Sequence, residues 1–587
     1  MNISDLPVGN FPDALSFPYF PTRWQLFIWR NWGIVAAERI AKVLSCSEEQ
    51  VTAAAVGMGL PEKVTVLPQW KVKGYQTIIR RNWHILDYEQ LLELLDWTPE
   101  RLDECLQHED FFYVKLGCHK PRCGALQYAP LTDAQAEATA VLRATVGKYF
   151  SAAEMLPSEL PFAFADNFGP RKRAGVSDDF DFNYIHSYAA SCGDVLGEAE
   201  ESDPVPENIL EEYESCGVKG VWMHALLCQL VPIPGAESFS RGYEKRMANL
   251  KRIVERCGKH GIKVFLYLNE PRGMNDEFYR LKPEWKGAKY KEELPLRAIC
   301  TTASPEPLQW LENAMYTLFR ETPGLGGVFT ITMSENPTNC YSHVQSKSQE
   351  CLCPSCSRHS AEEVVAGVIS AMERGMHAAA PEAKFIAYDW AWIVDAECSF
   401  EENFAFKKKI MNLLPKSVYV CSVSEWGMIT NVGGVEQYLR DYAISQVGPS
   451  EESRQVWEYA NSIGLKTAAK VQLNNSWEMS AVPYIPVPYL VREHIDRLKK
   501  AGVSALMLSW TLGGCPGGNL PMLDVTPEEL AAAQYSPEHA PAICRAWKEF
   551  SEAFRNFPFN VQVIYESPVN FGPSCLLFDK TTGYPST

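Results

Sequence analysis

From about residue 180 onward, short apolar segments alternate with helical segments at regular spacing. The apolar segments are rich in β-branched and aromatic residues, as buried parallel strands are, and they cover Phe182–Ala189, Gly220–Leu227, Lys263–Leu268, Gly327–Met333, Lys384–Tyr388, Val418–Val423, Thr467–Leu473 and Ala505–Ser509. Helical patterns separate most of them: Tyr243–Cys257, Pro307–Arg320, Ala361–Ala379, Glu402–Leu413, Glu451–Ser462 and Val491–Ala501. This alternation predicts an α/β fold, a (β/α)8 TIM barrel. A doubly wound sheet is the alternative, but the first strand is followed by no glycine-rich phosphate turn.

The region before the predicted barrel contains an internal duplication. Residues 24–51 align without gaps on residues 75–102, at an offset of 51. Each copy has an Arg-Asn-Trp stretch, an amphipathic helix, and then Ser47 or Thr98 as the N-cap of a second helix. The sequence therefore predicts an N-terminal, mostly helical module containing a duplicated helix-turn-helix-like unit.

DNA readers use helix-turn-helix geometry, but the acidic residues of both copies disfavour that role here. A small packing module, or Arg-Asn-Trp turns that reach a sugar site, are the two remaining interpretations. We predict the duplicated module over residues 1–120, a connecting segment over 121–179, the barrel over 180–525, and a C-terminal helix and tail over 526–587. The helix is expected over Pro537–Phe554, with Ser536 as its N-cap.

Charge and composition exclude several classes of partner. The net charge of −17 argues against nucleic acid, because phosphate neutralisation needs a basic face. No apolar run approaches the roughly 20 residues of a membrane span, and the N-terminus lacks a basic region followed by an apolar one. The 18 cysteines are scattered through helix-like and strand-like segments, which is typical of reduced thiols. We therefore expect a cytoplasmic protein.

Acids, amides and tryptophans gather where the predicted strands end. Glu335 follows the fourth strand, at the end where (β/α)8 barrels place their chemistry. Sugars bind to flat apolar faces and dense polar groups, and glycosidic cleavage needs a carboxyl that protonates the leaving oxygen and usually a second one. The candidate catalytic residues are Glu335, Asp389 and Glu425, and the candidate substrate-binding residues are Glu270, Arg272, Asn336, Trp390, Trp426, Asn474, Asn475, Glu478 and Trp510.

Several of these residues also allow a structural interpretation. Glu270, next to Arg272, fits an internal ion pair or a sugar clamp better than a catalytic acid. Asp389 could cap a helix, and Glu425 could orient a neighbour rather than react. Glu478 lies five residues past its strand, so it is expected to be a loop ligand or structural.

The glutamate after strand four resembles the acid of glycoside hydrolase families 20, the hexosaminidases, and 67, the α-glucuronidases. In family 20 an aspartate precedes the glutamate and polarises the substrate acetamido group, whereas Ser334 occupies that position here. In family 67 a serine precedes the acid, as in Ser334-Glu335, and later acids activate water. Asp389 and Glu425 are similar to those acids in placement. The resemblance covers the barrel only.

A cysteine-rich segment follows the predicted catalytic strand. Cys340 and His343 form one pair and Cys353 and Cys356 another, each with two intervening residues. Such spacing fits a closed, tetrahedral, structural Zn²⁺ site, which would hold the loop beside Glu335. Free thiols are the alternative, and no cofactor is expected to be needed for catalysis.

The leading functional prediction is a glycoside hydrolase that acts on the ends of small oligosaccharides and is hexosaminidase-like. An α-glucuronidase-like inverting hydrolase is the first alternative. The other class is a non-catalytic sugar-binding or regulatory barrel protein, which the duplicated module would suit. A carbohydrate partner follows from all three, and the sequence leaves the sugar, the anomer and the oligomeric state open.

Overall fold

The computed structural model describes residues 2–559, apart from 110–111, 152–153, 157–162, 170, 172–174, 176–177, 191–192, 290–293, 334–335, 343–349, 396 and 481. The chain forms two compact units, one up to Asp166 and one from Asn167 onward, which we call the N-terminal unit and the barrel unit. Each unit has its own hydrophobic core. In the described part of the chain, no helix combines the length and the apolar character that a membrane span requires.

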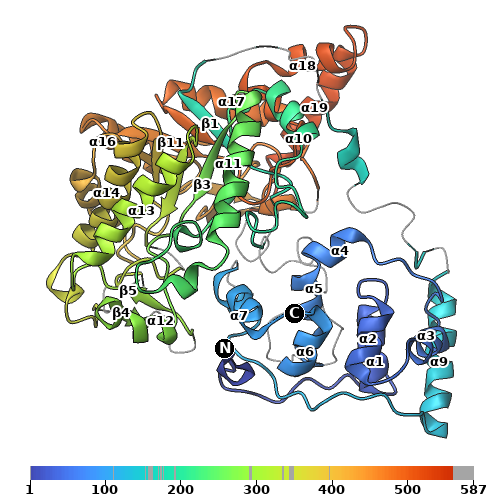
Figure 1. Cartoon of the computed structure of the whole chain (residues 1–587). Helices are drawn as coiled ribbons and strands as arrows, with labels where there is room; N and C mark the ends of the chain where they lie inside the picture. Colours follow the sequence, from blue (N-terminus) through green and yellow to red (C-terminus); the bar gives the residue numbers. More distant parts are fainter. Residues whose placement is uncertain are drawn as a thin grey trace. The chain divides into compact units, whose positions relative to one another are not determined.

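The N-terminal unit is helical (Figure 1). Its α-helices are α1 (Arg23–Asn31), α2 (Ala37–Leu44), α3 (Glu48–Gly57), α4 (Pro68–Lys73), α5 (Tyr75–Asn82), α6 (Tyr88–Leu95), α7 (Pro99–His108), α8 (Phe112–Lys115) and α9 (Asp133–Tyr149). The predicted N-caps are confirmed, because Ser47 accepts the Gln50 N–H at the start of α3 and Thr98 accepts the Arg101 N–H at the start of α7. The helical module and its duplicated unit are therefore present.

The two copies of the duplication meet through equivalent residues. The Asn31 and Asn82 side chains are fully buried and donate to each other reciprocally, at 2.9 and 2.8 Å. Each amide also donates to the carbonyl four residues earlier in its own helix. Since these asparagines belong to the Arg-Asn-Trp stretches, the contacts favour the interpretation of the duplication as a packing module.

The barrel unit contains the eight predicted strands, all parallel and closed into a barrel. They are β1 (Phe182–His186), β2 (Gly220–His224), β3 (Lys263–Tyr267), β6 (Gly327–Ile331), β7 (Lys384–Tyr388), β8 (Tyr419–Val423), β11 (Lys466–Lys470) and β12 (Ala505–Met507), with β12 pairing to β1. The (β/α)8 prediction is confirmed. Several strands end earlier than predicted, because the apolar residues that follow them continue into buried loops.

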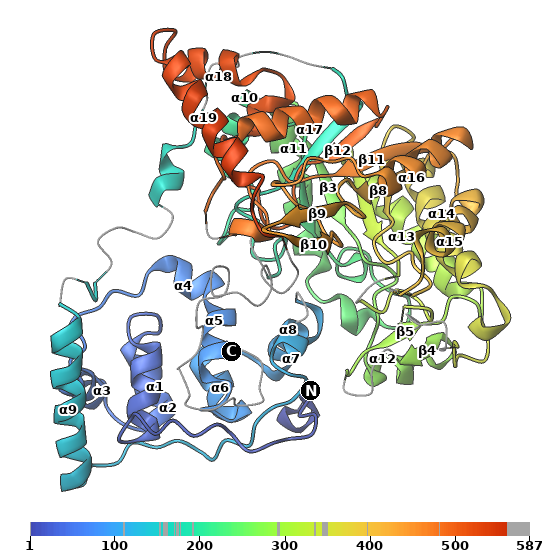
Figure 2. The same cartoon turned by 180° about the vertical axis from the view of Figure 1, so that it is seen from behind.

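Helices surround this barrel (Figures 1 and 2). They are α10 (Glu207–Ser215), α11 (Tyr243–Lys259), α12 (Asp276–Leu281), α13 (Glu306–Glu321), α14 (Ala361–Ala379), α15 (Phe400–Leu413), α16 (Glu451–Ser462), α17 (Pro488–Lys500), α18 (Pro527–Gln534) and α19 (Ala540–Phe554). The helix predicted from Pro537 begins at Ala540, and Ser536 accepts the His539 N–H just before it. Two short hairpins, β4 (Lys286–Lys289) with β5 (Arg297–Ile299) and β9 (Ile429–Val432) with β10 (Val435–Tyr438), were not predicted.

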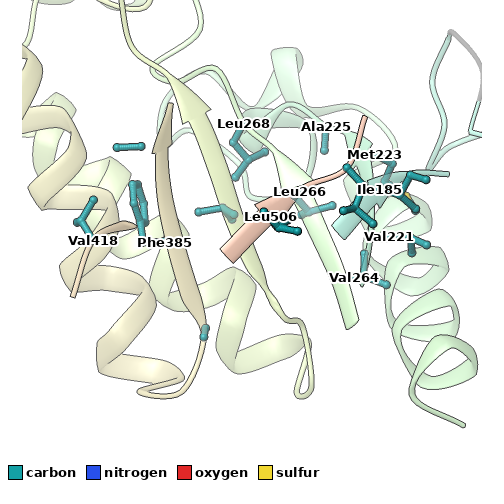
Figure 3. Close-up of a cluster of buried hydrophobic side chains, with 14 of the residues drawn as sticks. Ile185, Val221, Met223, Ala225, Val264, Leu266, Leu268, Phe385, Val418 and Leu506 are labelled. Carbon is teal, nitrogen blue, oxygen red and sulfur yellow. The ribbon is translucent and has the colours of Figure 1, made fainter. Parts of the chain in front are cut away.

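Alternation along the strands separates two apolar layers. Outward side chains pack under the helices, and Figure 3 shows ten of them labelled, among them Ile185, Leu266 and Leu506. Inward side chains fill the barrel with stacked aromatic rings, such as Phe182, Tyr184 and Phe265. Because side chains alternate with a period of two, the next inward positions lie at the C-terminal ends of the strands, where barrel enzymes place their sites.

Candidate functional site

Five partly buried aromatic side chains close the barrel interior at the ends of its strands: Tyr267, Trp390, Trp426, Trp477 and Trp510. We call them the aromatic collar. The Trp510 ring lies 5.3 Å from the Trp222 ring below it and 5.4 Å from the Tyr267 ring. The Trp390 and Trp426 rings meet edge to face at 5.4 Å. The predicted tryptophans Trp390, Trp426 and Trp510 therefore all belong to one aromatic surface.

A pocket of about 350 Å³ opens beside this collar, where the ends of β7 and β8 and the segments that follow them face helices α15 and α16. The predicted residues Asp389, Trp390 and Trp426 line it together. The other polar residues of its wall include Lys407, Ser422, Tyr438, Arg440 and Glu452. Its volume, its aromatic walls and its few converging polar groups are typical of a small-molecule site.

Asp389 is fixed in this pocket through one of its carboxylate oxygens. Oδ2 accepts from Lys407 Nζ at 2.5 Å and from Ser422 Oγ at 2.9 Å. The side chain is 4% exposed. Both of these hydrogen bonds to described residues use Oδ2. The other oxygen, Oδ1, can therefore accept a hydrogen bond from a ligand.

Glu452 is a second acid of the pocket, which we did not predict. It lies in the first turn of α16, and the Tyr438 hydroxyl donates to it at 2.9 Å. Burial raises the pKa of Glu452 above its usual value. An acid in the first turn of a surface helix is usually explained by its favourable interaction with the helix N-terminus, so no sequence pattern distinguishes Glu452 as a site residue.

Glu425 lies deeper than Asp389 and is completely buried. His494 Nε2 of α17 lies 3.2 Å from its Oε1. Burial raises the pKa of Glu425 well above its usual value. The same burial lowers the pKa of Lys470, an inward residue at the end of β11, to about 7. This environment favours the protonated form of Glu425, and the catalytic role of Glu425 stays a prediction.

Replacing Glu425 by glutamine is therefore expected to preserve folding at neutral pH, because an amide resembles a protonated carboxyl. Because its pKa is raised, Glu425 stays protonated in the folded chain, whereas in the unfolded chain it releases its proton above the ordinary pKa of 4.5. The contribution of Glu425 to the free energy of unfolding of the parent therefore falls as the pH rises. The melting temperature of Glu425→Gln, compared with that of the parent at the same pH, should therefore rise from pH 5 to pH 8. A variant that is several degrees less stable at pH 8 and equal at pH 5 would mean that Glu425 is ionised in the fold. Loss of activity in a stable variant would support its predicted catalytic role.

Glu270 and Arg272 lie at the end of β3, and both are buried. Glu270 Oε1 accepts the Leu227 N–H at 2.6 Å, and Oε2 accepts the Arg272 N–H at 2.8 Å. Burial raises the pKa of Glu270 to about 7. Glu270 thus connects the segments that follow β2 and β3 through their backbone N–H groups. The two sequence-based interpretations, an ion pair with Arg272 or a sugar clamp, stay predictions.

The predicted residues after β11 also bond to the protein. Asn474 Nδ2 donates to the Cys515 carbonyl and its Oδ1 accepts the Asn519 N–H, at 2.5 and 2.8 Å. Asn475 Nδ2 donates to the Val482 carbonyl at 2.6 Å. Glu478 accepts from the Ile444 N–H and the Ser476 hydroxyl, both at 2.6 Å. These three side chains fix the loops around the barrel end, and their substrate-binding roles stay predictions.

The segment that follows β6 carries the remaining predicted site residues and the predicted zinc ligands. Glu335 and His343 lie outside the described residues, and Asn336 is buried. Glu335 is the fourth residue after the end of β6. Of the predicted zinc ligands, Cys340, Cys353 and Cys356 are brought together, and Cys300 joins them.

Two histidines face the same end of the barrel. The His186 ring lies 4.5 Å from the Trp222 ring, and the His224 ring lies 5.5 Å from the Tyr267 ring. Burial lowers the pKa of His186 to about 4 and that of His224 to about 3. Both imidazoles are therefore neutral at pH 7 and can donate or accept a hydrogen bond there.

No protein-family model matches the chain, and a search of curated protein sequences gives no significant match. Among solved structures, the chain is similar to a GH138 enzyme targeting pectin rhamnogalacturonan II, with 11% identity and a TM-score of 0.34 over 68% of this chain and 39% of that one. It is also similar to Thermobaculum terrenum O-GlcNAc hydrolase, with 10% identity and a TM-score of 0.34 over 65% and 64% of the two chains. A glycoside hydrolase family 5 enzyme from Prevotella bryantii shows 9% identity and a TM-score of 0.33 over 66% of this chain and 100% of its own.

The chain thus spans less than two thirds of the first two of these structures. At such identities and TM-scores the likenesses define neither a family nor an activity. Functional conclusions therefore rest on the residues of the barrel end.

Proposed function

We propose that the barrel unit is a glycoside hydrolase that removes terminal sugars from small oligosaccharides, in the manner of a hexosaminidase. The observation that carries this proposal is the pocket in which Asp389, Trp390 and Trp426 converge. Tryptophan rings offer the flat apolar surface on which a sugar stacks, and the polar groups between them match its hydroxyls. The pocket lies at the C-terminal ends of the strands, the end that carries chemistry in this fold.

Glu335 is the proposed general acid, since it lies four residues after the end of β6 in the chain, and barrel enzymes carry their chemistry in the segments that follow the strands. It protonates the glycosidic oxygen as the bond to the anomeric carbon breaks. The acetamido oxygen of the substrate attacks the same carbon and forms a cyclic oxazolinium ion. Water then opens that ring, and Glu335 takes the proton of the attacking water.

Asp389 is the proposed partner of the acetamido group. A carboxylate that accepts the acetamido N–H increases the nucleophilicity of the acetamido oxygen, and family 20 places such an acid just before its glutamate. Ser334 cannot serve in that way because it carries no charge. Asp389, held by Lys407 and Ser422 through Oδ2, offers Oδ1 for the role.

A second candidate function is supported by the cations of the pocket. Lys407 and Arg440 both line it, and a uronic acid would need a cation to bind its carboxylate. In this α-glucuronidase-like scheme, Asp389 would activate a water molecule instead of orienting an acetamido group, and the reaction would invert configuration.

A panel of 4-nitrophenyl glycosides tests the proposal. We expect release of 4-nitrophenol from N-acetylhexosaminides, and turnover should fall by more than about tenfold when the N-acetyl group is replaced by N-trifluoroacetyl, since fluorine withdraws electrons from the attacking oxygen. An unchanged rate on the fluorinated substrate would contradict participation of the acetamido group. Release from glucuronides alone would support the second candidate. Tight sugar binding without release from any glycoside would favour a non-catalytic sugar-binding protein and overturn both.

A further inference from the structure

Four cysteine side chains from separate parts of the barrel unit converge on one point. Their Sγ atoms all lie within 4.8 Å of one another, and all four residues, Cys300, Cys340, Cys353 and Cys356, are buried. None of them forms a disulfide. Cys300 directly follows β5, whereas the other three lie in the segment between β6 and α14 (Ala361–Ala379).

The sulfur spacing fits one shared metal ion. Cys300 Sγ lies 3.5 Å from Cys353 Sγ and 3.5 Å from Cys356 Sγ. Tetrahedral Zn²⁺ with Zn–S bonds of about 2.3 Å separates its sulfur ligands by about 3.8 Å. A disulfide would need about 2.0 Å, so these two pairs are placed for a common ion rather than for a bond between them.

The surroundings of the sulfurs are also those of a metal site. The Ala288 N–H donates to Cys340 Sγ at 3.4 Å, and Thr302 Oγ1 lies 3.1 Å from Cys356 Sγ. Hydrogen bonds of this kind orient and stabilise metal-bound thiolates. A Cβ on Gly287 would lie 2.6 Å from Cys340 Sγ and 2.6 Å from the Ala298 carbonyl, so the hairpin backbone reaches the sulfurs only because residue 287 is glycine.

We infer that Cys300, Cys340, Cys353 and Cys356 bind one structural Zn²⁺ as a closed four-thiolate shell. Cys300 thereby takes the place that spacing alone assigned to His343. Four thiolates leave no open position for substrate, so the ion is structural rather than catalytic. It joins the β4–β5 hairpin to the segment that follows β6, and Cys340 is only five residues from the proposed acid Glu335.

Metal analysis of the purified full-length chain tests this inference. We expect about one zinc per chain, and loss of most of it in Cys300→Ser, since three sulfurs hold the ion far more weakly than four. Cys351→Ser is the matched control: Cys351 is buried in the same cluster, but its sulfur contacts the Cys340 carbonyl, at 3.6 Å, and is not among the four. The control should keep its zinc.

X-ray absorption on the unmodified chain decides the ligand set even if Cys300→Ser does not fold. Four sulfur neighbours at about 2.3 Å, with no nitrogen, are expected. Three sulfurs and one nitrogen would identify His343 as the fourth zinc ligand, in place of Cys300, and would overturn the inference. A chain without bound metal, one loaded with iron, or zinc loss in Cys351→Ser but not in Cys300→Ser would also overturn the inference.

Discussion

Replacing Glu335 by glutamine is expected to lower turnover on unactivated glycosides by about 10²–10⁴, the usual contribution of a general acid. An amide keeps the shape of the carboxyl but cannot deliver a proton to the leaving oxygen. A general acid must carry its proton when the substrate binds, so Glu335 is expected to be protonated in the active enzyme. Steady-state rates with natural oligosaccharides measure the loss.

The dependence on the leaving group separates acid catalysis from simple positioning. A dinitrophenolate leaves without protonation, so Glu335→Gln should lose much less activity on dinitrophenyl glycosides. Equal loss on both substrates would mean that Glu335 only positions the sugar, and full activity would mean that another acid acts. Glu458→Gln is the control, because Glu458 is an exposed residue of α16 and should give parent rates.

Replacing Glu478 by alanine is expected to lower the free energy of unfolding by about 2–5 kcal/mol, since the buried donors that it binds lose their partner. Glu478 is fully buried and accepts from the Ile444 and Ser445 N–H groups and from the Ser476 hydroxyl. These groups lie in two loops at the barrel end, so both loops should loosen. Denaturant unfolding measures the loss, and hydrogen exchange locates it.

Glu458→Ala is the matched control for this prediction. Its side chain is 65% exposed and lies 3.5 Å from Arg454, in a surface ion pair whose removal should leave the stability close to that of the parent. Glu478→Ala with parent stability and a strongly raised KM would instead support the substrate-binding role that the sequence suggested. Loss of stability with a small change in KM would identify Glu478 as a residue that holds the loops.

The barrel was predictable because its strands differ so clearly from their surroundings. Runs such as Gly327–Ile331 are apolar and bounded by turns, and the helices between them have their own periodicity. The caps Ser47 and Thr98 were predictable for a local reason, since an N-cap binds an N–H two or three residues away. The hairpins β4–β5 and β9–β10 were missed because their strands are short, partly polar and exposed.

The uses of the polar residues at the strand ends were harder to predict. Asn474, Glu270 and Glu478 have the composition expected of a sugar site, yet each bonds to backbone groups of neighbouring loops. Sequence cannot say which loop will approach which strand end. The contribution of Cys300 was missed for the same reason, because it lies 40 residues before Cys340 and meets it only through the fold.

A crystal structure of Glu335→Gln with a bound oligosaccharide would show whether Glu335 and Asp389 act on the same sugar. We predict a terminal sugar stacked on Trp390 or Trp426 beside Asp389, with its glycosidic oxygen about 2.6–3.2 Å from the side chain of residue 335. Sugar bound away from the aromatic collar, or a glycosidic oxygen beyond hydrogen-bond reach of that side chain, would mean that Glu335 is not the general acid of this pocket.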